Sequence, residues 1–164
     1  SVEVKEVATF LVSQEGATVR RLTLSGNEIT DGGKDMSGLT ALCEILPILK
    51  HPISLELANC GLGVAEVNEL AIAIQAGAAV ACLILDENPL TGGQWYNVDK
   101  DITGVTSLCD SLKTSSVTEL GLAKCRLGPG SLGKLAESEP LLGPHLEGYW
   151  SHGGLLGPLW RTIG

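Results

Sequence analysis

The sequence predicts an α/β fold built from repeats, and three observations lead to this prediction. A short pattern of paired leucines recurs four times along the chain. Helical patterns, with apolar residues three and four positions apart, lie between the recurrences. Hydrophobic residues make up 44% of the 164 residues but aromatic residues only 4%, so Leu, Val, Ile and Ala must build the core. This composition is typical of a thin, repetitive fold, and the length indicates one domain over 1–164.

The first predicted element is an amphipathic capping helix within 1–18. Val4, Val7, Ala8, Leu11 and Val12 have the spacing of one helical face. We expect this helix to cover the first strand, either as a cap of the domain or as the remnant of an upstream repeat.

Four repeats are predicted over 19–138, each with a short strand. They share the pattern L-x-L-x-x-[N/C]-x-[L/I], which occurs at 22–29, 55–62, 83–90 and 120–127. The two leucines of each pattern point inward from a strand with a two-residue period. The Asn or Cys in the turn can donate a hydrogen bond to carbonyls of a neighbouring repeat. These four residues are Asn27, Cys60, Asn88 and Cys125. Because one repeat cannot bury its apolar face alone, the repeats must stack.

A helix is predicted after each strand. Apolar residues fall at equivalent helical positions in the four repeats. They are Leu39, Leu42, Cys43 and Leu46; Val67, Leu70, Ala71 and Ile74; Val105, Leu108, Cys109 and Leu112; and Leu132, Leu135 and Ala136. Asp35 or Ser37, and Asp101 or Thr103, are the expected N-caps of the first and third of these helices.

The repeated pattern resembles that of leucine-rich repeat proteins, which carry Asn or Cys at this position. An apolar residue three positions before the first leucine fits the same family at Val19, Val80 and Val117, but Pro52 does not fit. First leucines are 33, 28 and 37 residues apart (22 to 55, 55 to 83, 83 to 120), so even the shortest unit contains a full helix. This length is similar to the ribonuclease-inhibitor-like subclass. The resemblance implies a short right-handed horseshoe, with parallel strands on the concave face, helices on the convex face and no enzymatic activity.

Two repeats carry insertions between strand and helix. The distance from the Asn or Cys to the shared helical leucine is 15, 10, 20 and 10 residues in the four repeats, so repeats one and three are longer by five and ten. We expect the inserted loops, at 30–37 and 91–103, to leave the same edge of the repeat stack. The longer one contains Trp95 and Tyr96, residue types that dominate interface hot spots. The alternative is that they pack locally against the shorter insertion.

After the repeats, 139–164 is predicted to form an irregular tail. From residue 140 to the end, 9 of 25 residues are Gly or Pro, and Tyr149, Trp150 and Trp160 occur there. Three possibilities stay open: the tail folds over the last repeat, binds a partner or is loosely ordered.

Charge and cysteine content exclude several classes of function. The net charge is −8, which argues against a nucleic-acid or anionic-membrane surface. The uncharged stretch 70–85 has 16 residues, fewer than the roughly 18–20 needed for membrane insertion. Five cysteines form no C-x-x-C pair, and an odd number leaves at least one without an intrachain disulfide, so we expect a reducing, cytoplasmic location. Cys82, next to an inward leucine, is the expected accessible thiol.

No motif for catalysis, a cofactor or a metal is found. Ser131, within Pro-Gly-Ser-Leu-Gly, has Pro where a nucleophile elbow needs Gly and precedes a helix instead of following a strand. His51, His145 and His152 are scattered, and Asp86-Glu-Asn88 lacks the ligand alternation of a calcium loop. We expect a protein that is not an enzyme and binds no cofactor or metal.

Strand phase assigns the residues that face outward on the concave side. Glu56, Asp86, Glu87 and Glu119 gather toward the middle and later repeats, with Ile84 among them. One interpretation is a surface for a basic segment of a partner protein; the other is ordinary solubilising charge.

These patterns predict a non-catalytic protein–protein interaction module. The expected partner-binding residues are Glu56, Ile84, Asp86, Glu87 and Glu119 on the strands and Trp95 and Tyr96 in the longer insertion. Two alternatives remain: a structural subunit of a larger assembly, and the recognition fragment of a larger sensor or ligase-type protein.

Overall fold

Helices and strands alternate along the chain. The structure is a computed structural model that describes residues 2–93 and 96–142. In chain order its elements are α1 (Val2–Leu11), β1 (Arg21–Thr23), α2 (Ser37–Ile45), β2 (Ile53–Glu56), α3 (Val64–Gln75), β3 (Val80–Ile84), α4 (Thr103–Leu112), β4 (Glu119–Gly121) and α5 (Pro129–Leu142). Two 3-10 turns, η1 (Gly16–Thr18) and η2 (Leu46–Ile48), follow α1 and α2. The predicted α/β class is confirmed.

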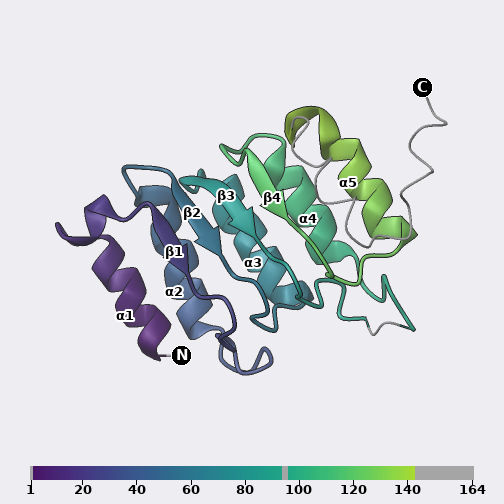
Figure 1. Cartoon of the computed structure of the whole chain (residues 1–164), viewed down its shortest axis with the longest axis horizontal. Helices are drawn as coiled ribbons and strands as arrows, with labels where there is room; N and C mark the ends of the chain where they lie inside the picture. Colours follow the sequence, from purple (N-terminus) through teal and green to yellow (C-terminus); the bar gives the residue numbers. More distant parts are fainter. Residues whose placement is uncertain (1, 94–95, 143–164) are drawn as a thin grey trace.

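The four strands form one parallel sheet in the order β1-β2-β3-β4. Leu22, Leu55, Leu83 and Leu120 are paired across the sheet, each with the next. Neighbouring parallel strands need a long crossover, and α2, α3 and α4 supply it. Figure 1 shows the strands side by side, with a helix following each one.

One face of the sheet is packed and the other is open. Leu55 of β2 and Leu83 of β3 are completely buried, and the predicted apolar positions of α2, α3 and α4 are buried with them. The strand residues directly before these leucines, Ser54 and Cys82, point to the other face and remain partly exposed. Leucine burial therefore supplies the main apolar contact between the sheet and the helices.

In repeat two, the residue buried in the core before the first leucine is not the one that the repeat pattern marks. Pro52 is exposed, and its neighbour Ile53 is buried and paired with Val80. The next pair is Ser54 with Cys82, so Ala81 is an extra residue in β3. This bulge absorbs the one-residue difference between the two strands.

A polar ladder runs along the turns that follow the strands. The Asn88 amide donates to the carbonyls of Leu57 and Leu85, both at 2.8 Å. Its Oδ1 accepts from the amides of Cys60 (2.9 Å) and Leu62 (3.0 Å). The prediction that this side chain links neighbouring repeats is confirmed.

Cys60 and Cys125, at the same position of their repeats, each link to the preceding repeat through one thiol hydrogen bond. The Cys60 thiol lies 3.2 Å from the Leu24 carbonyl, and the Cys125 thiol lies 3.1 Å from the Leu85 carbonyl. Burial raises the pKa of Cys125 to about 12, so its thiol keeps the proton it donates.

The helix at the start of the chain packs differently from the expectation. Val4, Ala8 and Leu11 are buried, but α1 ends at Leu11 and Val12 is exposed. The main neighbour of α1 is α2, so α1 extends the layer of helices instead of covering β1. The reason is geometric: the turn that includes η1 must first bring the chain back to the sheet before β1 can start.

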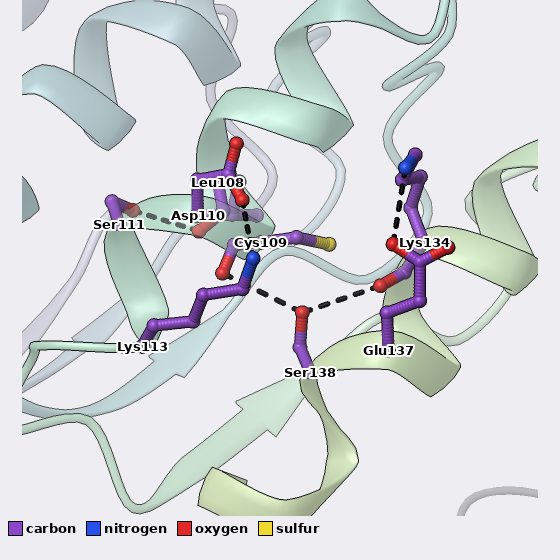
Figure 2. A network of polar contacts seen from close by, with 8 residues as sticks. All are labelled: Leu108, Cys109, Asp110, Ser111, Lys113, Lys134, Glu137 and Ser138. Atoms are coloured by element: carbon purple, nitrogen blue, oxygen red, sulfur yellow. Dashed lines mark hydrogen bonds and ion pairs between the residues drawn. The ribbon is translucent and has the colours of Figure 1, made fainter.

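The last helix packs on α4 through a buried hydroxyl. Ser138 is fully buried, and its hydroxyl lies 3.2 Å from the Lys134 carbonyl and 3.5 Å from the Cys109 carbonyl of α4. Figure 2 shows Ser138 between the two helices, with the ion pairs Asp110–Lys113 and Lys134–Glu137 at either side. Burial raises the pKa of Cys109, in agreement with the packing role expected of it.

The predicted start of the irregular tail is wrong by four residues. Helix α5 runs to Leu142, across Pro140. A proline lacks the amide hydrogen that would bond to the carbonyl four residues earlier, but a helix can lose one such bond near its end and continue. The rest of the tail lies outside the described residues. Within the described part, no helix has the length and apolar character needed to cross a bilayer.

Candidate interaction surface

The open strand face consists of the outward side chains of the four strands. Two columns cross it in register: Arg21, Ser54, Cys82 and Glu119, then Thr23, Glu56, Ile84 and Gly121. Both columns follow from the two-residue period of the strands, as the sequence predicts. The face therefore brings Glu56, Ile84 and Glu119 together from three neighbouring strands.

Glu56 is neutralised within the face. Its carboxylate pairs with the Arg21 guanidinium and accepts a hydrogen bond from the Thr23 hydroxyl at 2.8 Å. The Thr23 bond, together with Arg21, holds the pKa of Glu56 below its ordinary value. Glu56 is thus a charged residue already bound to a basic partner on β1.

Ile84 and Asp86 lean toward β4 because Gly121 has no side chain. A Cβ at Gly121 would come within 2.8 Å of the Asp86 carboxylate and 2.9 Å of the Ile84 Cδ1 atom. Asp86 Oδ1 accepts from the Ala123 amide at 2.9 Å. Ile84 stays partly exposed, so the face has an apolar centre beside a carboxylate fixed to backbone.

The other two acids lie at the margins. Glu87 forms an exposed ion pair with Lys124 at 2.7 Å, linking the turns after β3 and β4. Glu119, on β4, is exposed. Of the five acidic or apolar strand residues predicted to bind a partner, two carry an ion pair to a basic neighbour, which reduces the local negative charge.

Cys82 is the most accessible thiol, as expected. The other four cysteines are buried and Cys82 is partly exposed. Partial burial raises the pKa of Cys82, and the carboxylates of Glu119 and Glu56 raise it further. At neutral pH this thiol is protonated, so it contributes a small polar contact and not a nucleophile.

The insertion in repeat one is fixed to the following repeat by Glu66. Thr30 is buried, and its hydroxyl donates to Glu66 Oε1 at 3.2 Å. Glu66 Oε2 accepts from the Gly63 amide at 3.0 Å and so caps α3. The predicted N-cap of α2, Asp35 or Ser37, is wrong: the N-cap position is Met36, without a side-chain capping bond, and Asp35 Oδ1 instead accepts from the Ser37 amide at 3.0 Å.

The insertion in repeat three is fixed in a corresponding way by Asp99. Its carboxylate accepts from the amides of Gly128 (2.9 Å) and Gly130 (2.7 Å), and also from the buried Ser131 hydroxyl. Asp99 thus caps α5 from the preceding repeat, where α3 uses its own Glu66. Sequence reasoning missed Asp99. Ser131, at the position that Glu66 has in repeat two, also accepts from the Gly128 amide at 3.0 Å, so the repeat pattern itself gives no signal for Asp99.

Asp99→Asn is expected to lower the free energy of unfolding at pH 7 by about 1–2 kcal/mol. Asn tolerates the left-handed backbone of this position (φ 56°). Its side-chain NH2 group, however, replaces one carboxylate oxygen and cannot accept the hydrogen bonds that this oxygen accepts. Partial burial raises the pKa of Asp99, but bonds from Ser131 and the backbone amides lower it more, to below the ordinary 3.8. A carboxylate whose pKa is lowered by folding stabilises the protein at pH values above its ordinary pKa. This stabilisation is lost as the pH falls through the pKa of the folded state.

The difference between wild type and Asp99→Asn should therefore shrink as the pH is lowered from 5 toward 2, in urea titrations followed by circular dichroism. Asp110→Asn is the control, because Asp110 is exposed and paired only with its helical neighbour Lys113. An equal loss in both variants would contradict the capping role of Asp99.

Both insertions leave the edge of the sheet where the strands end, at the lower side of Figure 1. Tyr96 is 72% exposed. Trp95, predicted with it as a contact residue, lies outside the described residues.

Among the described residues, no group of three His, Cys, Asp or Glu side chains is placed to hold a metal ion. Ser131, the residue at the centre of the elbow-like motif, is buried and bonded to Asp99. The geometry therefore describes a surface with fixed charges, an apolar centre and two anchored loops.

Comparison with known proteins adds no further assignment. No protein-family model matches the sequence, and no curated protein matches it at a significant level.

Proposed function

We propose that this chain is a leucine-rich repeat module of the ribonuclease-inhibitor-like type that binds a protein partner without catalysis. In this proposal the chain is a short right-handed solenoid, with β1–β4 on its concave face and the helices on its convex face. The partner contacts the open strand face and the insertions at 30–37 and 91–103.

The observation that carries the proposal is the open strand face. Its side chains come from four strands in register, and the described helices leave it accessible. An extended surface of this kind is what stacked repeats use for binding. Ile84 provides an apolar contact at its centre, and the exposed Glu119 is the acid on the strands that stays open to a cation.

The anchored insertions support the same proposal. Thr30 and Asp99 tie the two loops to the helices of the next repeats, so the loops are held before a partner arrives. Holding a binding loop in place reduces the entropy that binding would otherwise cost.

The proposal is tested by affinity purification with paired variants of the whole chain. We expect Ile84→Thr and Glu119→Lys, on the open strand face, to reduce the recovery of the main bound protein at least fivefold. Ile72→Thr and Glu44→Lys are the matched controls, because Ile72 and Glu44 are exposed on α3 and α2. Recovery with the controls should remain within a factor of two of wild type.

Melting temperatures of all four variants show whether each is folded. Equal recovery with the strand and helix variants would reject the open strand face as the binding surface.

A further inference from the structure

A groove lies at the sheet edge opposite the insertions. It is formed by the turn between α1 and β1 and the turn between α2 and β2, and has a volume of about 380 Å³. Leu11 and Ile53 are buried at its base, while Val12 and Ile48 are 49% and 65% exposed. A groove of this size and apolar lining falls in the range of about 300–1,000 Å³ that holds a few side chains or a small ligand.

The backbone of the turn after α1 forms one wall of the groove. The turn after α1 folds back so closely that a Cβ at Gly16 would lie 1.9 Å from the Phe10 carbonyl oxygen. A hydrogen bond from the Gly16 amide to the Ser13 hydroxyl, at 3.1 Å, holds the backbone of this turn in place. The Ala17 and Val19 amides also bond within the turn, to the carbonyls of Ser13 and Gly16 at 3.0 Å each.

The rim of the groove is basic in an acidic protein. Lys50 and His51 line it, and Arg20 is held beside it by bonds from its guanidinium to the Ala17 and Val19 carbonyls (3.2 and 3.3 Å). Glu15 is the one acid within residues 11–20, and residues 46–53 contain none, although the whole chain carries 19 acids against 11 bases. Within the described part of the chain, neither Arg20 nor Lys50 has an ion-pair partner.

From this charge reversal we infer that the groove binds an acidic segment of a partner protein that carries large apolar side chains. The apolar side chains enter between Val12 and Ile48, and neighbouring carboxylates contact Arg20 and Lys50. Charge complementarity favours such a segment over a second copy of this chain, whose net charge of −8 opposes association. The site is separate from the open strand face and the insertions, so it goes beyond the function proposed above.

The test uses three synthetic 12-residue peptides with a fluorescent label and the whole chain. One peptide has two Phe and two Leu among Asp and Glu, the second has Lys in place of every acid, and the third has Ser in place of every apolar residue. Fluorescence anisotropy should show saturable binding of the first peptide alone, weakening at least fivefold between 50 and 500 mM NaCl.

Variants then locate the binding. Ile48→Asp and Lys50→Glu should each weaken binding at least tenfold, whereas Ile72→Asp and Lys5→Glu, at exposed positions outside the groove, should change it less than twofold. Ile84→Thr should also leave it unchanged, which separates this site from the open strand face. Melting temperatures confirm that Ile48→Asp and Lys50→Glu remain folded.

Three results would overturn the inference. The first is no binding of the acidic peptide, or equal binding of the Lys peptide. The second is an equal loss with Ile48→Asp and Ile72→Asp. The third is a concentration-dependent dimer in sedimentation velocity that Ile48→Asp abolishes, because a second copy would then occupy the groove.

Discussion

Asn88→Ala is expected to lower the free energy of unfolding by about 3–5 kcal/mol, the largest effect of any single polar substitution in this chain. Asn88 is 1% exposed, and its side chain hydrogen-bonds to five backbone groups in two successive repeats. In the variant, the Leu85 carbonyl keeps its hydrogen bond from the Cys125 thiol. The Leu57 carbonyl and the amides of Cys60 and Leu62 lose the bonds that they make with Asn88. Each buried group left without a bond costs about 1–3 kcal/mol, less when neighbours adjust together.

The matched control is Asn27→Ala, at the same position of repeat one. Asn27 is exposed, and its amide bonds only to the nearby carbonyls of Leu24 and Ser25. Its loss should cost less than about 1 kcal/mol. Urea unfolding followed by circular dichroism measures both. Equal losses in the two variants would show that the ladder does not hold the repeats together.

Asn88→Cys separates donor from acceptor in the same experiment. A thiol can donate to the Leu57 carbonyl, as Cys60 and Cys125 donate at their positions, but it is a poor acceptor for two amides. Its stability should fall between wild type and Asn88→Ala.

Gly104→Ala is expected to cost about 3 kcal/mol, even though alanine is the better helix former. Gly104 lies in the first turn of α4, where it meets the start of α3. A Cβ there would lie 2.6 Å from the Val64 carbonyl oxygen and 3.3 Å from two further Val64 backbone atoms. Because these are backbone atoms, the clash is relieved only if the two helices move apart.

Gly133→Ala provides a control of opposite sign. Gly133 is exposed in α5, and no atom lies within 4 Å of its added Cβ. Alanine should stabilise this site by up to about 1 kcal/mol, because glycine costs more backbone entropy in a helix. Thermal unfolding of both variants tests the pair. A Gly104→Ala protein as stable as wild type would contradict the close approach of α3 and α4.

Much of the fold could be predicted because its causes are periodic. The register of Leu22, Leu55, Leu83 and Leu120 follows from one pattern repeated at the same strand phase. The burial of Cys43 and Cys109 follows from their shared place on two similar helices. The ladder at Asn88 could be predicted because an amide that both donates and accepts suits a turn between stacked units.

What the sequence did not reveal depends on contacts outside this period. Asp99 reaches α5 because it lies in the ten-residue insertion, and no repeat position marks such a residue. Ile53 replaces Pro52 in the core because β3 carries one extra residue, a feature of the pairing between two strands. The pairing of Glu56 with Arg21 depends on side-chain reach across strands, so outward phase alone overstates the negative charge of the open strand face.

The groove between the first two helix-to-strand turns was also outside the prediction. It depends on the backbone path through Gly16, which brings the turn against the end of α1. Apolar and basic residues from 11–20 and 46–53 meet there because parallel strands start at one edge of the sheet.

The parallel register of the strands is the central claim, and hydrogen-bond scalar couplings in NMR measure it directly. Three cross-peaks are predicted: from the Leu24 amide to the Glu56 carbonyl, from Leu57 to Ile84, and from Leu85 to Gly121. These bonds are 2.9, 2.8 and 2.9 Å long. Couplings from the same amides to carbonyls in an antiparallel order, or shifted by one residue, would contradict the account, because every outward side chain would then change its place.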